Sequence, residues 1–386
     1  MDFTDFIDFM DFIMKIALVH DYLAQDGGAE RVLKAFHELW PQAPIFVLFH
    51  DPQKISGFDR EQIRESFLAR FPFINQKFQW FLPLMPIATE RHNLEGFDVV
   101  LSSTSSFAKG VLTSPETLHI SYCHTPTRYL WSDTHSYIAD LPYSPLVKMF
   151  LPRLISRLRL WDKMSADRVD HFIANSETVR TRIQKYYRRD STVIFPPVNF
   201  DTFHLSETVG NYFLAGGRLV PYKNLDLIIR TFNRLGYPLK IFGTGPEFEG
   251  LRRIAKPNVE LLGHVTEREK ADLLASCLAF VHPQIEDFGI TPLETMASGR
   301  PVIAYAAGGA TETVVAGESG LFFPEQTWES LYDAVLHFEG KTWDSQKIRE
   351  SANRFRSETF KENIRTYVNH HYEEFKHGLK QPALWR

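Results

Sequence analysis

Short apolar segments alternate with amphipathic helical segments along this chain, and the whole alternation occurs twice. The first series of apolar segments lies at 15–19, 45–49, 98–102, 119–122 and 171–175, and the second at 212–217, 239–243, 259–263, 279–283 and 301–305. Segments that are apolar along their full length are typical of strands buried on both faces of a parallel sheet. We therefore predict two doubly wound, Rossmann-like α/β domains in succession.

The break between the two series falls in VIFPPVNFDTFHL, residues 193–205. Two adjacent prolines fix an extended path and cannot continue a helix, which favours a linker here. We predict a first domain over 14–198 and a second over 199–359, while residues 1–13, which repeat Asp-Phe every three positions, are interpreted as an appendage. Ligands of doubly wound sheets bind at the carboxyl ends of the strands, so two such domains are expected to face each other across a cleft.

The composition argues against several classes of protein. A formal net charge of −4 gives no overall attraction to nucleic acid. Two cysteines, Cys123 and Cys277, cannot form a disulfide framework or a thiolate metal site, which favours a reducing compartment and a cytoplasmic location. No apolar run reaches the roughly 20 residues that cross a bilayer, and the acidic N-terminus is unlike a signal peptide. No metal-ligating cluster or Asp-x-Asp stands out, so we expect no metal and no cofactor.

The stretch IEDFGITPLETMASGRP, residues 285–301, contains two glutamates separated by seven residues. Glu294 stands three residues after Thr291, and Pro292 follows Thr291 directly, which is typical of a capping box with proline at the first helical position. Capping alone is therefore a strong alternative to a chemical role for Glu294. Glu286 lies before the helix and has no capping role. Free amides at a helix start suit an anion, and the residues concerned are Phe288, Gly289, Ile290 and Thr291.

The loop AGGRLVPYKN, residues 215–224, follows the first strand of the second series. Gly217 ends that strand, and Arg218 and Lys223 follow it before the next helix. These two cations suit a diphosphate, Arg through a bidentate fork and Lys as a compact charge. A solvated surface pair is the alternative if the loop is considered alone. Gly243 and Gly245 of IFGTGPE, like AAGGATETV at 306–314, allow a ligand to approach or simply form tight turns.

Two loops of the first series contain further candidate binding or catalytic residues. HDYLAQDGGAERV, residues 20–32, places Gly27 and Gly28 at the start of a helix, where their amides can face an anion. This is not the G-x-G-x-x-G fingerprint, so a nicotinamide cofactor is disfavoured. In SYCHTPTRYLW, residues 121–131, His124 follows a strand directly, and a structural and a functional role are about equally favoured.

Taken in this order, the loops resemble those of the retaining glycosyltransferases of family four, which have the GT-B fold. The resemblance covers nearly the whole chain from Met14. It implies that Arg218 and Lys223 bind the donor diphosphate, that Glu294 contacts the ribose, and that Glu286 lies beside the transferred sugar. It also adds His264 and Val265 to the nucleotide site. In that fold the last helix crosses back, so about 360–380 is expected to belong to the first domain.

The segment around His124 looks most like the mannosyltransferases of bacterial polysaccharide and O-antigen assembly. That likeness implies GDP-mannose as the donor and a saccharide or lipid-linked acceptor, with a UDP-hexose donor as the alternative. The resemblance implies His124, Glu286, Arg218 and Lys223 as the catalytic residues. Hydrolysis is disfavoured because the cations suit a departing diphosphate, and glycosidases need only their two carboxyls. A catalytically silent nucleotide-sugar binder is a further alternative.

Residues 147–164, VKMFLPRLISRLRLWDKM, mix five basic residues with large apolar ones. A basic amphipathic helix can lie on an anionic membrane. A peripheral contact with the inner face of the cell membrane would also suit a lipid-linked acceptor. An ordinary surface helix with one buried face is an equally good interpretation of this stretch.

Overall fold

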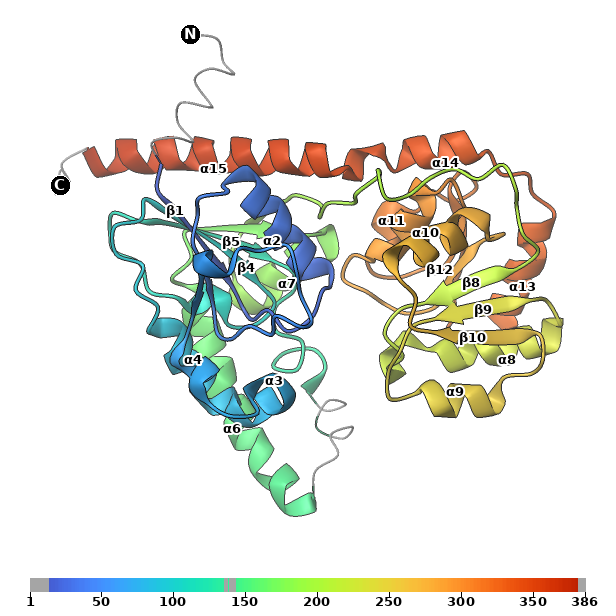
Figure 1. Ribbon diagram of the computed structural model, residues 1–386, viewed down its shortest axis with the longest axis horizontal. Helices are drawn as coiled ribbons and strands as arrows, with labels where there is room; N and C mark the ends of the chain where they lie inside the picture. Colours follow the sequence, from blue (N-terminus) through green and yellow to red (C-terminus); the bar gives the residue numbers. More distant parts are fainter. Residues whose placement is uncertain (1–13, 135–137, 139–143, 381–386) are drawn as a thin grey trace, which may run out of the picture. The chain divides into compact units, whose positions relative to one another are not determined.

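The computed structural model describes residues 14–134, 138 and 144–380, and the predicted appendage at 1–13 lies outside them. The chain divides into two units, each built on one parallel sheet (Figure 1). One unit ends at Pro196 and takes up the chain again from Phe360, and the other spans Pro197–Thr359. The prediction of two parallel, doubly wound α/β domains is confirmed.

The sheet of the first unit has seven strands in the order β3-β2-β1-β4-β5-β6-β7, and every neighbouring pair is parallel. The order reverses between β1 and β4, which makes their carboxyl ends the switch point of the sheet. The strands are Ile16–His20 (β1), Ile45–Val47 (β2), Ile63–Glu65 (β3), Val99–Thr104 (β4), Leu118–Cys123 (β5), His171–Ala174 (β6) and Ser191–Val193 (β7).

The helices of this unit cover both faces of its sheet. They are Gly28–Leu39 (α2), Ile74–Lys77 (α3), Met85–Glu90 (α4), Pro145–Ala166 (α6), Glu177–Tyr187 (α7) and Ser357–Lys380 (α15), with 3₁₀ turns at Arg60–Gln62, Phe67–Arg70, Phe78–Leu84 and Ala108–Gly110. Helix α15 belongs to this core: Phe360, Ile364, Val368 and Tyr372 are buried in it, and Phe360 stacks on Phe36 of α2.

The sheet of the second unit has six parallel strands in the order β10-β9-β8-β11-β12-β13, with the reversal between β8 and β11. The strands are Phe213–Gly216 (β8), Leu239–Phe242 (β9), Val259–Gly263 (β10), Phe280–His282 (β11), Val302–Tyr305 (β12) and Gly320–Phe323 (β13). The helices are Leu225–Leu235 (α8), Phe248–Ile254 (α9), Glu267–Ser276 (α10), Ile290–Ala297 (α11), Ala310–Thr313 (α12), Trp328–Glu339 (α13) and Ser345–Ser351 (α14), with 3₁₀ turns at Pro221–Lys223 and Asn353–Phe355.

Three strands were not predicted, namely β3, β7 and β13. All three lie at an edge of their sheet. Two of the three residues of β3 are exposed, and β7 has no buried residue. For β3 and β7 the reason is that an edge strand needs no continuous apolar run, because one side of it faces solvent. The third strand, β13, is apolar throughout (GLFF), and the sequence analysis missed it. In the described part of the chain, no helix combines the length and the apolar character that crossing a bilayer requires.

Candidate functional site

In the second unit, the predicted diphosphate loop and the first predicted glutamate meet at the switch point. Lys223 follows β8, Glu286 follows β11, and the ammonium of Lys223 forms a direct ion pair with the Glu286 carboxylate. Both side chains are largely shielded from solvent, at 13% and 19% exposed. Arg218 is exposed instead, and its guanidinium lies 3.4 Å from the Tyr222 hydroxyl. The structure therefore brings Lys223, and not Arg218, to Glu286.

A buried histidine that the sequence analysis missed completes this group. His282 is the last residue of β11 and is 1% exposed, and neither of its ring nitrogens forms a hydrogen bond with a residue that the structure describes. Its Nε2 lies 4.0 Å from Oε2 of Glu286. Burial, with a smaller effect of the Lys223 charge, lowers the pKa of His282 to about 3, so the ring is neutral. His282 ends a strand, as His124 follows one, so the same feature of the sequence could have identified His282 as a candidate.

The start of α11 corrects the predicted capping box. The helix begins at Ile290, its N-cap is Gly289 in a left-handed conformation (φ 87°), and no side chain caps it. Pro292 is consequently the third helical residue rather than the first. Glu294 is 1% exposed, and its carboxylate accepts a hydrogen bond from Lys270 Nζ of α10 at 3.1 Å. Lys270 therefore provides a buried counter-charge for the Glu294 carboxylate.

Lys270 lies on a helix that connects Glu294 with the other residues predicted to bind the nucleotide. It is 8% exposed and also pairs with Glu267 at 2.9 Å. His264 and Val265, which follow β10, line a cavity of about 470 Å³ together with Glu269 and Asp272 of the same helix α10. One helix thus carries both the partner of Glu294 and one wall of this cavity.

The glycines after β8 and β9 hold two loops against each other. Gly243 has a left-handed φ of 123°, and a Cβ there would overlap the carbonyl oxygen of Gly217. Gly245 approaches the backbone of Leu219 in the same way. Close packing between the loops accounts for both glycines, and ligand contact at these positions stays a prediction. Phe288 also has a packing role, since it is buried against Phe355.

In the first unit, the Gly27 amide is already occupied. Gly27 is the N-cap of α2 and Gly28 its first residue, as expected. The Gly27 N–H donates to Oε2 of Glu30 at 2.9 Å. It is therefore not open to an anion, in contrast to our expectation from the sequence.

His124 ends a row of buried polar groups at the carboxyl ends of β1, β4 and β5. Its Nε2 lies 2.8 Å from Oγ of Ser103, which lies 3.1 Å from Nδ1 of His20. Nε2 of His20 lies 3.7 Å from Oε1 of Glu30. Burial, with the His20 charge next in importance, lowers the pKa of His124 to about 3. The neutral ring of His124 can donate or accept one hydrogen bond at each nitrogen.

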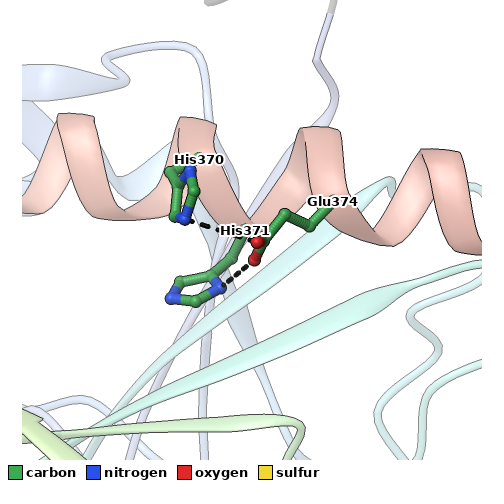
Figure 2. A group of neighbouring side chains, drawn as sticks. All are labelled: His370, His371 and Glu374. Carbon is green, nitrogen blue, oxygen red and sulfur yellow. Dashed lines mark hydrogen bonds and ion pairs between the residues drawn. The ribbon is translucent and has the colours of Figure 1, made fainter.

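A group with metal-ligating side chains lies elsewhere, on α15 (Figure 2). Glu374 contacts Nε2 of His370 at 3.5 Å and Nδ1 of His371 at 3.0 Å. The His371 ring stacks on His171, the first residue of β6, which places the group at the amino ends of the strands. Among the residues described by the structure, no comparable group lies at the carboxyl ends, where His124 and Glu286 are found.

Two protein families match consecutive parts of the chain. Residues 26–202 match the family described as "Glycosyltransferase Family 4", and residues 200–358 match "Glycosyl transferases group 1". The O-antigen chain mannosyltransferase C of Escherichia coli is 30% identical over 219 residues, which cover 52% of this chain and 57% of the relative. The α-1,3/1,6-mannosyltransferase ALG2 of Rhizomucor pusillus is 24% identical over 405 residues, covering 85% of each chain.

Among solved structures, HepE of Anabaena in complex with UDP has the same fold, with a TM-score of 0.66 and 17% identity. The match covers 92% of this chain and all of HepE. Several curated relatives are matched over only about half their length, as with a glycosyltransferase of Methanocaldococcus jannaschii at 52%.

Proposed function

Because this chain belongs to the GT-B glycosyltransferases, with a family 4 domain followed by a group 1 domain, we propose that it transfers a hexose from a nucleotide sugar to a saccharide or lipid-linked acceptor. The group formed by Lys223, Glu286 and His282 beside the uncapped start of α11 carries this proposal. A cation, helix-start amides without an N-cap side chain and a buried neutral histidine suit a sugar diphosphate. Polysaccharide biosynthesis is the corresponding role.

The reaction we propose retains the anomeric configuration. The acceptor oxygen forms a bond to the anomeric carbon while the bond from that carbon to the diphosphate breaks, and the acceptor proton passes to the departing phosphate. Lys223 and Arg218 stabilise the charge on the leaving group, while Glu286 and His282 orient the sugar. Since protein cations supply the positive charge, we propose that the reaction needs no metal, and full activity after EDTA treatment is the expected result.

For the donor, we favour GDP-mannose, because the E. coli and Rhizomucor relatives are named mannosyltransferases. The cavity beside His264 and Val265 is the subsite we assign to the base. Glu294, held by Lys270, is assigned to the ribose. A UDP-hexose donor and a catalytically silent nucleotide-sugar binder are the alternatives.

A ligand panel tests these assignments. The thermal unfolding temperature is measured with GDP, UDP, ADP and NAD, and the chain is then incubated with GDP-mannose. We expect selective stabilisation by GDP and release of GDP that increases when acceptor is added. Stabilisation by UDP alone would favour the UDP-hexose, GDP binding without turnover would favour the silent binder, and stabilisation by none of them would contradict the nucleotide-sugar proposal.

We also propose that α6 brings the acceptor side of the protein to an anionic membrane surface. Its exposed apolar residues are Met149, Phe150, Leu160 and Met164. Arg153 and Arg157 are exposed on the same helix. Apolar side chains flanked by arginines suit the boundary between head groups and acyl chains.

A further inference from the structure

Three buried residues of the first unit, Glu30, His20 and Ser103, form a row that leads from a carboxylate to His124. His20 and Ser103 are register partners on the neighbouring strands β1 and β4. Glu30, His20 and Ser103 are at most 3% exposed, and the carboxyl ends of β1, β4 and β5 bring His20, Ser103 and His124 into one row. The mechanism above assigns no role to Glu30, His20 or Ser103.

The Ser103 hydroxyl constrains the two imidazole rings on either side of it. It lies 3.1 Å from Nδ1 of His20 and 2.8 Å from Nε2 of His124. A hydroxyl has one proton, so it can donate to one ring and must accept from the other. Of the two ring nitrogens that face Ser103, one must therefore donate a hydrogen bond and the other must accept one. The tautomer of one histidine thus determines the tautomer of the other.

Glu30 determines which atoms donate and which accept the hydrogen bonds along this row. Burial raises the pKa of its carboxyl, but His20 and the backbone amides of Gly27 and Glu30 outweigh this effect and lower the pKa overall. Glu30 is therefore a carboxylate, which only accepts hydrogen bonds. It faces Nε2 of His20 at 3.7 Å and so favours a proton on that nitrogen. In a neutral His20 ring, Nδ1 then has none and accepts from Ser103.

We propose that Glu30, His20 and Ser103 form a positioning relay that keeps the proton of His124 on Nε2. The Nδ1 atom of His124 is then a hydrogen-bond acceptor for a hydroxyl of the sugar acceptor. His124 is partly exposed, and the described residues provide no hydrogen-bond partner for its Nδ1. This substrate contact rests on the proposed function, whereas the tautomer of His124 does not.

The chain offers a matched control on the neighbouring strands β4 and β5. Ser102 and His119 form an equivalent buried pair, with 3.0 Å between Ser102 Oγ and His119 Nε2. Among the residues that the structure describes, no hydrogen bond or ion pair joins this pair to His124. Ser102→Ala therefore removes a buried serine hydroxyl from a histidine without touching the relay.

The test is ¹⁵N NMR of the full chain labelled at histidine, recorded at pH 8. The His124 signals are identified by their loss in His124→Gln. We expect the Nε2–H tautomer in the unmodified chain, in Ser102→Ala and in Ser103→Thr, which keeps the hydroxyl. In Ser103→Ala we expect a mixture of tautomers. The Nδ1–H tautomer in the unmodified chain, as a doubly protonated His20 would impose, overturns the relay, and so does an unchanged tautomer in Ser103→Ala.

Kinetics separate the relay from the proposed function. If the chain transfers sugar, Ser103→Ala should lower kcat/KM for the acceptor roughly three- to tenfold, the value of one ordinary hydrogen bond, with the donor KM unchanged. Ser103→Thr should restore it. Absence of transferase activity in every variant, with the expected NMR result, would contradict the proposed function alone.

Discussion

At the scale of single residues, Lys223 has the clearest predicted effect on catalysis. Replacing Lys223 with Ala should lower kcat at least tenfold, since about 1.4 kcal/mol of transition-state stabilisation corresponds to that factor. Arg218→Ala should do the same if the exposed guanidinium reaches the donor diphosphate. Lys240→Ala, which removes a partly exposed cation from β9 of the same unit, serves as the control. Near-normal kcat in both Lys223 and Arg218 variants would contradict the assignment of the diphosphate.

We expect Gly243 to contribute to the free energy of unfolding, in addition to any contact that it makes with a ligand. An alanine there requires a left-handed backbone and overlaps Gly217, so Gly243→Ala should lower the free energy of unfolding by about 1–3 kcal/mol or more. Gly250 lies in α9 with open space around it, and Gly250→Ala should raise the same quantity by roughly 0.5–1 kcal/mol. Urea unfolding curves measure both. Equal effects of the two substitutions would show that the loops after β8 and β9 can separate at little cost.

At the scale of elements, a buried ion pair anchors α6. Lys109 Nζ lies 2.5 Å from Oδ1 of Asp162, and both side chains are 1% exposed. Asp162 also accepts hydrogen bonds from Thr127 at 3.0 Å and Trp131 at 2.7 Å. One carboxylate of α6 thus holds the turn at Ala108–Gly110 and the loop that follows His124.

Removing this buried cation leaves the Asp162 charge uncompensated. Lys109→Ala should therefore lower the free energy of unfolding by about 3–5 kcal/mol. Lys163→Ala is the matched control on α6, because Lys163 pairs with Asp167 at the surface, and it should cost about 0.5 kcal/mol or less. Chemical denaturation of both variants tests this, and a small loss in Lys109→Ala would mean that water or a rearranged side chain compensates Asp162.

The exposed face of α6 predicts selective membrane binding. Among the residues of α6 whose exposure the structure describes, the large apolar ones at the surface, Met149, Phe150, Leu160 and Met164, are between 60% and 68% accessible. The chain should sediment with vesicles containing anionic lipid and not with neutral ones. Changing both Arg153 and Arg157 to Gln should weaken binding roughly thirtyfold, at about 1 kcal/mol per arginine.

The same charge change on α9 provides the control for this experiment. Arg252 and Arg253 are exposed on that helix, and replacing both with Gln should leave sedimentation unchanged. Equal binding to neutral and anionic vesicles, or binding to neither, would remove the membrane proposal.

At the scale of the whole molecule, buried neutral histidines make stability depend on pH. Burial lowers the pKa of His119 and of His282 from 6.5 to about 3, and that of His92 to about 4. Between pH 6.5 and 4 the unfolded chain binds protons at these positions and the folded chain does not. The free energy of unfolding should therefore fall as the pH falls through this range, by up to about 1.4 kcal/mol per pH unit for each such histidine.

Urea midpoints at pH 7.5, 6.5, 5.5 and 4.5 measure this dependence. His119→Gln should make it less steep, whereas replacing His377, which is exposed on α15, should leave it unchanged. Stability that stays constant between pH 6.5 and 4.5 would show that these histidines become protonated in the folded chain.

The pattern of residues along the chain was enough to predict the fold and the loops in which to look for a site. Strands buried on both faces need apolar side chains throughout, so all ten predicted strands appear in the structure, and the GT-B resemblance is confirmed by the family matches. Strand-to-helix loops likewise follow from chain order, because parallel strands end at one edge of the sheet. That is why Lys223, Glu286 and His124 could be selected.

The partners of the buried polar and charged groups became apparent only in the folded chain. Lys223 and Glu286 are 63 positions apart, Lys270 and Glu294 are 24 apart, and His20 and Ser103 are 83 apart. A local pattern suggested that Glu294 caps its own helix, but a buried lysine on α10 compensates its charge instead. Pairing of buried charges depends on which strands and helices are neighbours in space, and spacing along the chain does not contain that information.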